Sequence, residues 1–355
     1  MPARLLEPNY IALDLTYRCP LSCDFCFMSR SGCRGTSRRE LRLPALKKLV
    51  DALSGKPREF WICGGEPALR PDLPELVACI KARGHRCFVT SGGWPMKKET
   101  ALRLLEAGID EIVFSLHGTP AVHDRVVGAK GAFARTAALC AAVNASPLKG
   151  NTRLSVWCTI HPRNHRNLHA AYKAFKALRP DHIAFNHLEY VRSRDIAAVR
   201  DLFRRELGCG TAVKASEELA RGMDVARLLR EMARIRAERD PSVRFELDLT
   251  PAEIRAWYDP AAEVPKKGFC LGQWNCLWVV PDGTLVSCQP LGHRLGRLRG
   301  GDYRRAFNGP AYRRFRALLM RQGGFLGVCS RCGRSSHSSE HYERTQGAQA
   351  RRPRA

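Results

Sequence analysis

Short apolar runs alternate with helical patterns along the first half of the chain. Between Tyr10 and Val191, six apolar runs are separated by segments whose apolar residues are spaced to form one face of a helix. This alternation is typical of parallel βαβ units, in which a helix joins each strand to the next. Six such strands form an α/β sheet of the incomplete-barrel or doubly wound kind. The predicted strands are 10–16, 58–63, 86–91, 111–116, 153–160 and 182–188, and the predicted helices lie near 43–54, 72–83, 97–107, 131–144 and 164–178.

Glycines, polar residues and cysteines collect directly after four of the predicted strands. Residues 19–26 (CPLSCDFC) follow the first strand and residues 64–67 (GGEP) follow the second. Gly92-Gly93 follows the third strand and His117-Gly118 follows the fourth. In sheets of this kind, ligands bind at the carboxyl ends of the strands. The sequence therefore predicts a functional site at that edge of the sheet.

The character of the sequence changes after residue 192. Residues 193–264 are charged and helical in pattern, and Thr250-Pro251-Ala252-Glu253 predicts a capped helix start. Residues 265–341 are rich in cysteines and turns, and Pro281-Asp282-Gly283 predicts a hairpin between CLWVV and TLVSC. We therefore expect a barrel over 1–192, a helical connector over 193–264, a small cysteine-rich α+β domain over 265–341 and a disordered basic tail over 342–355.

Composition and charge limit the class of protein. With 355 residues of which 45% are hydrophobic, the chain can bury a sizeable core. No apolar run approaches the roughly 20 residues that span a bilayer, and Glu7, Pro8 and Asn9 interrupt any signal peptide, so we expect a cytoplasmic protein with no membrane partner. The net charge of +25 suits a polyanionic partner such as nucleic acid, a nucleotide or an acidic peptide. The basic residues are not gathered into one patch with aromatics, however, which favours ordinary solvated basic faces.

Three cysteines, Cys19, Cys23 and Cys26, lie within eight residues. The cytoplasm keeps thiols reduced, so grouped cysteines favour metal or cluster ligation over disulfides. A zinc site needs a fourth ligand, and the loop contains none. An iron–sulfur cluster that is held by three thiolates leaves one iron open to a ligand that is not protein. The three cysteines therefore predict such a cluster.

This CxxxCxxC loop, with Phe25 before its third cysteine, resembles the signature of the radical S-adenosylmethionine (SAM) enzymes. The resemblance extends to GGEP at 64–67, to Thr90-Ser91-Gly92 and to Ser115-Leu116-His117-Gly118, although Ser91 and His117 stand where the family often has Asn and Asp. It implies a partial (β/α)6 barrel, in which the three cysteines bind three irons of a 4Fe-4S cluster and SAM chelates the fourth. Glu66 would hold the methionyl ammonium or cap the next helix, and the two serines would bond SAM or the loop backbone. The residues implied to bind SAM are Phe25, Gly64, Gly65, Glu66, Ser91 and Ser115.

A second group of cysteines resembles the auxiliary-cluster domains called SPASM and Twitch. The segment lacks the seven cysteines of a full SPASM domain, so the single-cluster Twitch form fits better. The resemblance implies one auxiliary 4Fe-4S cluster, and Cys276 competes with Cys270 as a ligand. Zinc is the alternative, because His337 and His341 follow Cys329-x2-Cys332 at a zinc-like spacing. The expected auxiliary ligands are Cys270, Cys288, Cys329 and Cys332.

Together these features predict an enzyme that reductively cleaves SAM to a 5'-deoxyadenosyl radical and abstracts hydrogen from a peptide or an anionic small molecule. The auxiliary cluster would assist electron transfer, and a carrier such as flavodoxin or ferredoxin would supply electrons. The alternative is a nucleic-acid-binding protein whose cysteines hold zinc or a structural cluster. It explains the charge but not the cysteine loop and GGEP in register on successive strands. We expect substrate contacts from Asn186, His187, Glu189 and Tyr190, and a solvated face from His161, His165 and His169.

Overall fold

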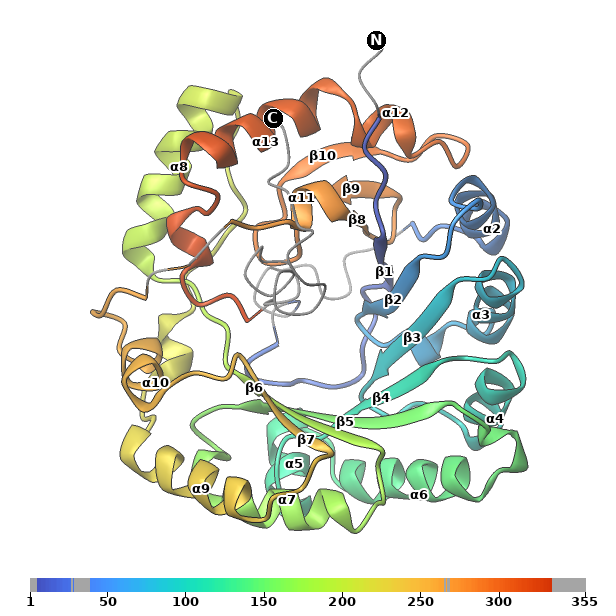
Figure 1. The fold of residues 1–355 in the computed structure, drawn as a ribbon, viewed down its shortest axis with the longest axis vertical. Coiled ribbons are helices and arrows are strands. Elements are labelled where there is room, and N and C mark those ends of the chain that lie inside the picture. Colours follow the sequence, from blue (N-terminus) through green and yellow to red (C-terminus); the bar gives the residue numbers. More distant parts are fainter. Residues whose placement is uncertain (1–4, 27, 29–38, 265, 267–268, 334–355) are drawn as a thin grey trace.

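The computed structural model describes residues 5–26, 28, 39–264, 266 and 269–333. Its centre is one ten-stranded sheet with the strand order β10-β9-β8-β1-β2-β3-β4-β5-β6-β7. All neighbours from β8 through to β7 pair in parallel, whereas the β8-β9 and β9-β10 pairs are antiparallel. Figure 1 shows the sheet curving around the centre of the molecule, with most of the helices outside it. The α/β class that the alternation predicts is confirmed.

The first six strands follow the predicted order, and one or two helices lie between each of them and the next. Observed and predicted strand bounds agree to within one residue at every end, because each strand is a distinct apolar run between polar turns. The elements of this half are β1 (Tyr10–Thr16), α2 (Leu43–Ala52), β2 (Glu59–Gly64), α3 (Leu73–Ala82), β3 (Arg86–Ser91), α4 (Lys98–Glu106), β4 (Glu111–Ser115), α5 (Pro120–Val127), α6 (Ala132–Ala145), β5 (Arg153–Ile160), α7 (Leu168–Lys176) and β6 (His182–His187).

Alternation along the strands separates the helix-covered core from the barrel interior. In β2, Phe60 and Ile62 are buried in the main core together with side chains of the surrounding helices. Trp61 and Cys63, the alternate positions of the same strand, line the cavity inside the barrel. Because successive side chains of a strand point to opposite faces, each strand contributes both to stability and to the site.

The segment that was expected to be a helical connector contains helices and one further strand. Its elements are α8 (Ser193–Leu207), α9 (Val225–Ala237), β7 (Val243–Glu246) and α10 (Pro251–Tyr258). Strand β7 pairs in parallel with β6, with Val243 opposite Ile183, so this segment extends the barrel sheet. The predicted capping box is confirmed, because Thr250 and Glu253 bond reciprocally at the start of α10.

The cysteine-rich segment also joins the barrel sheet. It contains α11 (Gly272–Asn275), β8 (Cys276–Val279), β9 (Thr284–Val286), β10 (Arg294–Arg297), α12 (Arg304–Phe307) and α13 (Pro310–Arg321). The hairpin predicted at Pro281-Asp282-Gly283 is confirmed, with Gly283 at a φ of 84°. Strand β8 pairs in parallel with β1, with Cys276 opposite Tyr10. The two cysteine-bearing segments therefore share one sheet.

Within the described ranges, no single helix is long and apolar enough to cross a membrane. Helices α5 and α6 meet the length and composition criteria only as a pair, which is bent by 112°. The expected basic tail at 342–355 and the two candidate zinc ligands His337 and His341 lie outside the described residues.

Candidate functional site

The three cysteines of the first loop lie together just after β1. The N–H of Cys26 donates to the carbonyl of Cys23 at 3.1 Å, and the N–H of Ser22 donates to the carbonyl of Val127 at 2.9 Å, which fastens the loop to the end of α5. Burial and the charges of Cys26 and Cys19 raise the pKa of the Cys23 thiol. Thiols this close repel one another when ionised, and bound iron would remove that repulsion. The loop therefore fits a cluster that takes three thiolates.

The GGEP segment fastens this loop to the end of β2. The N–H of Gly65 donates to the carbonyl of Thr16 at 2.7 Å, and the N–H of Glu66 donates to the carbonyl of Arg18 at 2.8 Å. A Cβ on Gly65 would lie 2.3 Å from the Arg18 oxygen. Gly64 has a φ of 117°, and a Cβ there would lie 2.6 Å from the Thr16 oxygen. Glycine is required at both positions because two backbone segments meet there without an intervening side chain.

Glu66 is a buried carboxylate that connects the ends of β2 and β3. It is 1% exposed and accepts hydrogen bonds from the N–H of Ala68 at 3.0 Å, the hydroxyl of Ser91 at 2.8 Å and the N–H of Gly92 at 2.8 Å. Burial raises its pKa, although these three bonds oppose the change. The hydroxyl of Ser91 also accepts from the N–H of Gly93 at 2.9 Å. Glu66 thus caps the turn at 67–69, and both side chains have protein partners.

An aromatic cluster lies beside the cysteine loop. The ring of Phe25 lies 4.7 Å from the ring of His117 and 5.0 Å from that of His161. Burial, with the neighbouring His123 and His161, holds the pKa of His117 well below its usual range, so this imidazole is neutral at physiological pH. Its Nδ1 accepts from the N–H of Thr159 at 3.2 Å, which leaves the proton on Nε2. His117 therefore offers a donor at the position where the family often has an acidic side chain.

A cavity of about 1280 Å³ occupies the barrel interior. The three cysteines of the first loop line it, and it reaches Gln289 and Gly333, the residues that directly follow Cys288 and Cys332. One continuous space therefore extends from the first cysteine group to the edge of the second. All the side chains and glycines expected to bind SAM also line it, namely Phe25, Gly64, Gly65, Glu66, Ser91 and Ser115.

Aromatic rings form one wall of this cavity. Trp61 stacks on Phe88 with ring centroids 6.1 Å apart, and Trp157 lies 6.3 Å from Phe88. The indole N–H of Trp61 donates to the hydroxyl of Thr90 at 2.9 Å, so its polar atom is already satisfied. The wall therefore presents mainly apolar ring faces. Sequence reasoning missed these residues, although they occupy alternate positions of the predicted strands.

Ion pairs close the opposite end of the barrel, where the strands begin. Arg86 pairs with Glu59 at 3.2 Å, and Arg153 pairs with Glu111 at 2.7 Å. The hydroxyl of Ser155 also donates to Glu111, at 2.5 Å. These arginines line the cavity, but a carboxylate already neutralises each of them.

The second cysteine group contains the four expected auxiliary ligands. Burial raises the pKa of the Cys329 thiol, and the charges of Cys332, Cys270 and Cys288 raise it further, so the four thiols lie near one another. No three His, Cys, Asp or Glu side chains in the described ranges are arranged to hold a single metal ion. A cluster of four irons holds its thiolates around a cube rather than around one ion, so a group of four cysteines suits it.

The competing ligand, Cys276, lies in an apolar cluster against which Cys288 also packs. It is the first residue of β8, is 5% exposed, and packs with Ala12 and Trp278 in a small apolar cluster. The charge of Cys270 acts on Cys329, together with those of Cys332 and Cys288. The arrangement therefore favours Cys270 as the ligand.

The residues expected to contact substrate after β6 divide into two sets. Asn186, His187 and Glu189 line the cavity, as expected. Tyr190 does not, and its expected contact is wrong: the side chain is 3% exposed and its hydroxyl donates to the carbonyl of Trp257. A position at the end of a strand predicts the edge of the sheet but not the direction of the side chain.

The histidines at the start of α7 also differ from expectation. His161 and His165 are 2% and 0% exposed, so the predicted solvated face is wrong for both. The Nε2 of His165 accepts from the N–H of Asp224 at 3.1 Å, and His169 pairs with Glu238 at 2.7 Å. The two ends of helix α9 thus contact His165 and His169, and the ring of Phe25 lies beside His161, none of which the sequence spacing reveals.

This fold and site define a radical SAM protein with an additional iron–sulfur segment. The family model of the radical SAM superfamily matches residues 13–169, and the model of the SPASM iron–sulfur cluster-binding domain matches residues 270–333. The chain belongs to the radical SAM superfamily and has a SPASM domain at its C-terminal end. The two domains imply 4Fe-4S clusters together with SAM.

The chain is similar to several characterised members of this superfamily. It is 30% identical to the PqqA peptide cyclase of Ruegeria pomeroyi over 79% of this chain and 67% of that protein. It is 31% identical to the Fe-coproporphyrin III synthase of Methanosarcina barkeri, over 54% of this chain. The chain spans about half the length of that protein, 48%, and of the PqqA peptide cyclase of Methylocella silvestris, 50%.

Solved structures share the fold at low sequence identity. The structure of Streptococcus suis SuiB bound to the precursor peptide SuiA covers 91% of this chain and 71% of SuiB, with a TM-score of 0.61 and 14% identity. Native anSMEcpe with bound AdoMet covers 87% of this chain and 83% of anSMEcpe, with a TM-score of 0.62 and 16% identity.

Proposed function

We propose that this protein reductively cleaves SAM and abstracts hydrogen from a side chain of a peptide substrate, with one auxiliary 4Fe-4S cluster assisting electron transfer. Similar proteins named as PqqA peptide cyclases, and the similar fold of SuiB bound to its precursor peptide, support a peptide substrate. The observation on which the proposal depends is the cavity, because it connects the loop of Cys19, Cys23 and Cys26 to the surroundings of the second cysteine group.

In this proposal the first loop and the glycines position the cofactors. Cys19, Cys23 and Cys26 bind three irons, and the close backbone contact at Gly64 and Gly65 fixes the loop on the sheet. When bound, the cluster and SAM supply one electron and a 5'-deoxyadenosyl radical that takes a hydrogen atom from the substrate. A space that is enclosed by the barrel wall would protect a reactive carbon centre from side reactions.

The aromatic wall of the cavity favours an aromatic side chain of the peptide. Trp61, Phe88 and Trp157 present ring faces, and aromatic rings pack well against each other at centroid distances of about 4.5–7 Å. The arginines of the cavity floor, Arg86 and Arg153, are already paired with carboxylates, so the floor offers little excess positive charge to an anion.

The second cysteine group would hold the auxiliary cluster through Cys270, Cys288, Cys329 and Cys332. Four protein ligands leave no open iron, which suits transfer of an electron rather than binding of substrate. A small carrier such as flavodoxin or ferredoxin would supply electrons from outside.

To test the ligand set, Cys270, Cys288, Cys329 and Cys332 are all changed to Ala, and iron, sulfide and zinc are measured, with Cys276→Ala as the matched control. We expect the quadruple variant to lose the iron of one cluster and the Cys276→Ala protein to keep it. Zinc in the parent, with no loss of iron in the quadruple variant, would exclude the auxiliary cluster.

The central test is formation of 5'-deoxyadenosine by the reconstituted protein under dithionite without oxygen. We expect product from the parent and from Cys209→Ala, which changes a cysteine outside both groups, and none from the triple Ala variant at Cys19, Cys23 and Cys26. Failure of the parent to cleave SAM, combined with salt-dependent binding to nucleic acid, would instead favour the nucleic-acid alternative.

A second test identifies the class of side chain. One random peptide pool is synthesised twice. The first version has deuterium in Tyr, Phe and Trp, and the second has deuterium in Asp, Glu and Ser. Deuterium in 5'-deoxyadenosine is then measured by mass spectrometry. We expect transfer from the aromatic pool and a weaker transfer after Trp61→Leu. Transfer from the second pool alone would contradict the aromatic assignment.

A further inference from the structure

A buried arginine stands between the last two cysteines of the second group. Arg331 separates Cys329 and Ser330 from Cys332, and its side chain is 1% exposed. A buried charge is costly unless polar partners surround it, so a fully buried guanidinium has to be closely matched by its neighbours. Arg331 is therefore a buried structural residue of this segment and not part of a solvated basic face.

The guanidinium of Arg331 is held by carbonyl oxygens at the end of α10 and in the loop that follows. Its Nη2 donates to the carbonyls of Ala256 at 3.0 Å, Asp259 at 2.8 Å and Ala262 at 2.7 Å. Its Nε donates to the carbonyl of Trp257 at 3.3 Å. The last carbonyls of a helix lack partners within the helix and lie at the negative end of its dipole, so a cation is favoured there.

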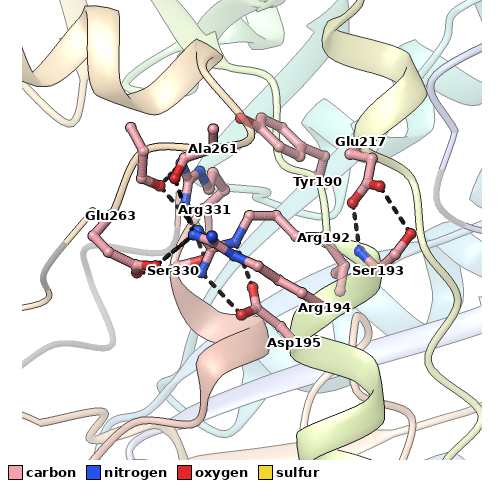
Figure 2. A network of polar contacts seen from close by, with 12 residues as sticks. Tyr190, Arg192, Ser193, Arg194, Asp195, Glu217, Ala261, Glu263, Ser330 and Arg331 are labelled. Atoms are coloured by element: carbon pink, nitrogen blue, oxygen red, sulfur yellow. Dashed lines mark hydrogen bonds and ion pairs between the residues drawn. The ribbon is translucent and has the colours of Figure 1, made fainter.

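A second layer of contacts fixes the same loop. Tyr190 lies under the guanidinium, with the ring centroid 5.6 Å from its central carbon. Arg192 donates to Asp195 at 2.7 and 2.9 Å and to the carbonyl of Ala262 at 2.9 Å. Figure 2 shows these side chains meeting between α8, the loop after α10 and the cysteine segment. The guanidinium of Arg331 thus enters a loop that other side chains also hold.

Two backbone contacts hold the residues on the far side of Arg331. Lys266 donates to the carbonyl of Cys332 at 2.7 Å, and the N–H of Gly333 donates to Glu189 at 2.8 Å. Glu189 also lines the cavity. The segment from Cys329 to Gly333 is therefore anchored at three residues: Arg331, Cys332 and Gly333. Of these three, Arg331 is the one that lies between the two cysteines in the sequence.

We propose that Arg331 is a positioning residue of the auxiliary cluster, with two effects. It fixes the turn that presents Cys329 and Cys332, and it places a permanent positive charge in the segment between these two cysteines. A nearby cation favours the more negative, reduced state of a cluster, and so raises its reduction potential. This inference rests on the proposed ligation by the four cysteines, and it adds a determinant of the electron-transfer step.

The experiment separates geometry from charge in a background where Cys19, Cys23 and Cys26 are Ala, so that only the auxiliary cluster remains. Arg331→Met removes both the hydrogen bonds of the guanidinium and its charge, whereas Arg331→Lys keeps the charge but not the guanidinium geometry. Arg58→Met is the matched control, because Arg58 is also buried and also donates to a backbone carbonyl, that of Leu53 at 2.8 Å, but lies at the start of β2. Each reconstituted protein is titrated by EPR for its midpoint potential and challenged with a chelator for iron retention.

We expect Arg331→Met to lose iron faster than the parent background, by about 10–100-fold if the typical loss of metal affinity on removing a residue that orients ligands appears in the rate of release. The cluster that remains should have a lower midpoint potential. Arg331→Lys should also lose iron faster but keep a potential near that of the parent, and Arg58→Met should change neither quantity. Parental retention and potential in both Arg331 variants would overturn the proposal.

Thermal melting of the apo-proteins controls for misfolding. If Arg331→Met does not fold, Arg331→Lys decides: faster iron loss with an unchanged apo melting temperature supports the positioning role, and unchanged retention contradicts it. If the parent background itself binds no cluster, the proposed ligand set fails and this inference fails with it. If the parent binds a cluster and the variants do not differ from it, only the inference about Arg331 fails.

Discussion

Replacing Gly65 by Ala tests whether contact between the ends of β1 and β2 positions the first cysteine loop. The added Cβ would lie 2.3 Å from the Arg18 carbonyl oxygen and 2.9 Å from the Tyr17 carbonyl carbon. Ordinary contact begins at 3.4 Å, so the two segments have to separate by about 1.1 Å. Both neighbours are backbone atoms and cannot rotate away. The displacement would therefore pass to Cys19, the residue after Arg18.

The energetic cost follows from two terms. Overpacking of a tight site costs about 1–3 kcal/mol. Separation also weakens the bonds from Gly65 to Thr16 and from Glu66 to Arg18, each with a net value of about 0.5–1.5 kcal/mol. The free energy of unfolding should fall by about 2–4 kcal/mol, which for a chain of this size lowers the melting temperature by about 3–5 °C.

The assay compares Gly65→Ala with Gly210→Ala. A Cβ at Gly210 meets nothing within 4 Å, and its φ lies outside the left-handed range, so this control adds the same methyl group without a clash. We expect Gly65→Ala to show the lower melting temperature, reduced iron in the first cluster and at least about 100-fold slower SAM cleavage, since misplacement by about 1 Å has that effect. A Gly65→Ala protein with the melting temperature and iron content of the control would refute the reasoning.

Three further predictions address other parts of the molecule. In Glu66→Gln, the NH2 group of the new amide has to face at least one of the three donors, which come from Ala68, Ser91 and Gly92. Urea denaturation should therefore show that the free energy of unfolding falls by about 2–4 kcal/mol, and an unchanged midpoint would contradict this. Thr250→Ala removes the cap of α10 and should cost about 1 kcal/mol in the same assay, whereas Thr211→Ala, outside any helix, should cost less. Burial alone would raise the pKa of Glu7, but bonds from Tyr303, Arg304 and Arg58 lower it from 4.5 to about 2. The stability that Glu7 contributes is therefore complete above pH 4.5 and is lost as the pH falls toward 2, so the advantage of the parent over Glu7→Gln should shrink in acid, and a constant difference would exclude this linkage.

The sequence predicted the parts of the fold that local patterns specify. The six barrel strands and the capping box at Thr250 depend on alternation and turn residues within a few positions of each other. Strand β7 was missed because its four residues, Val243–Glu246, gain their regular structure mainly by pairing with β6. The pairing of β8 with β1 joins positions more than 250 residues apart, and no local pattern indicates it.

The candidate site was predictable to the same degree. The cysteines and GGEP occur in short motifs, so their grouping could be anticipated. The directions of Tyr190 and Arg331 could not, because each is fixed by carbonyls near the end of α10 that are distant in sequence. Charge counting placed Arg331 among solvated arginines, whereas packing makes it part of the second cysteine group.

The parallel pairing of β1 with β8 makes the two cysteine groups parts of one site. Strand β1 leads directly to Cys19, and β8 lies between Cys270 and the hairpin that leads to Cys288. Their separation is therefore set by the register of one sheet and not by the long segment at 193–264. A slip of one residue between β1 and β8 would turn Trp278 from the barrel side of the sheet to the other, so burial strongly opposes it. Electron transfer falls steeply with distance, so a shared sheet of fixed register would keep the distance between the two proposed clusters constant.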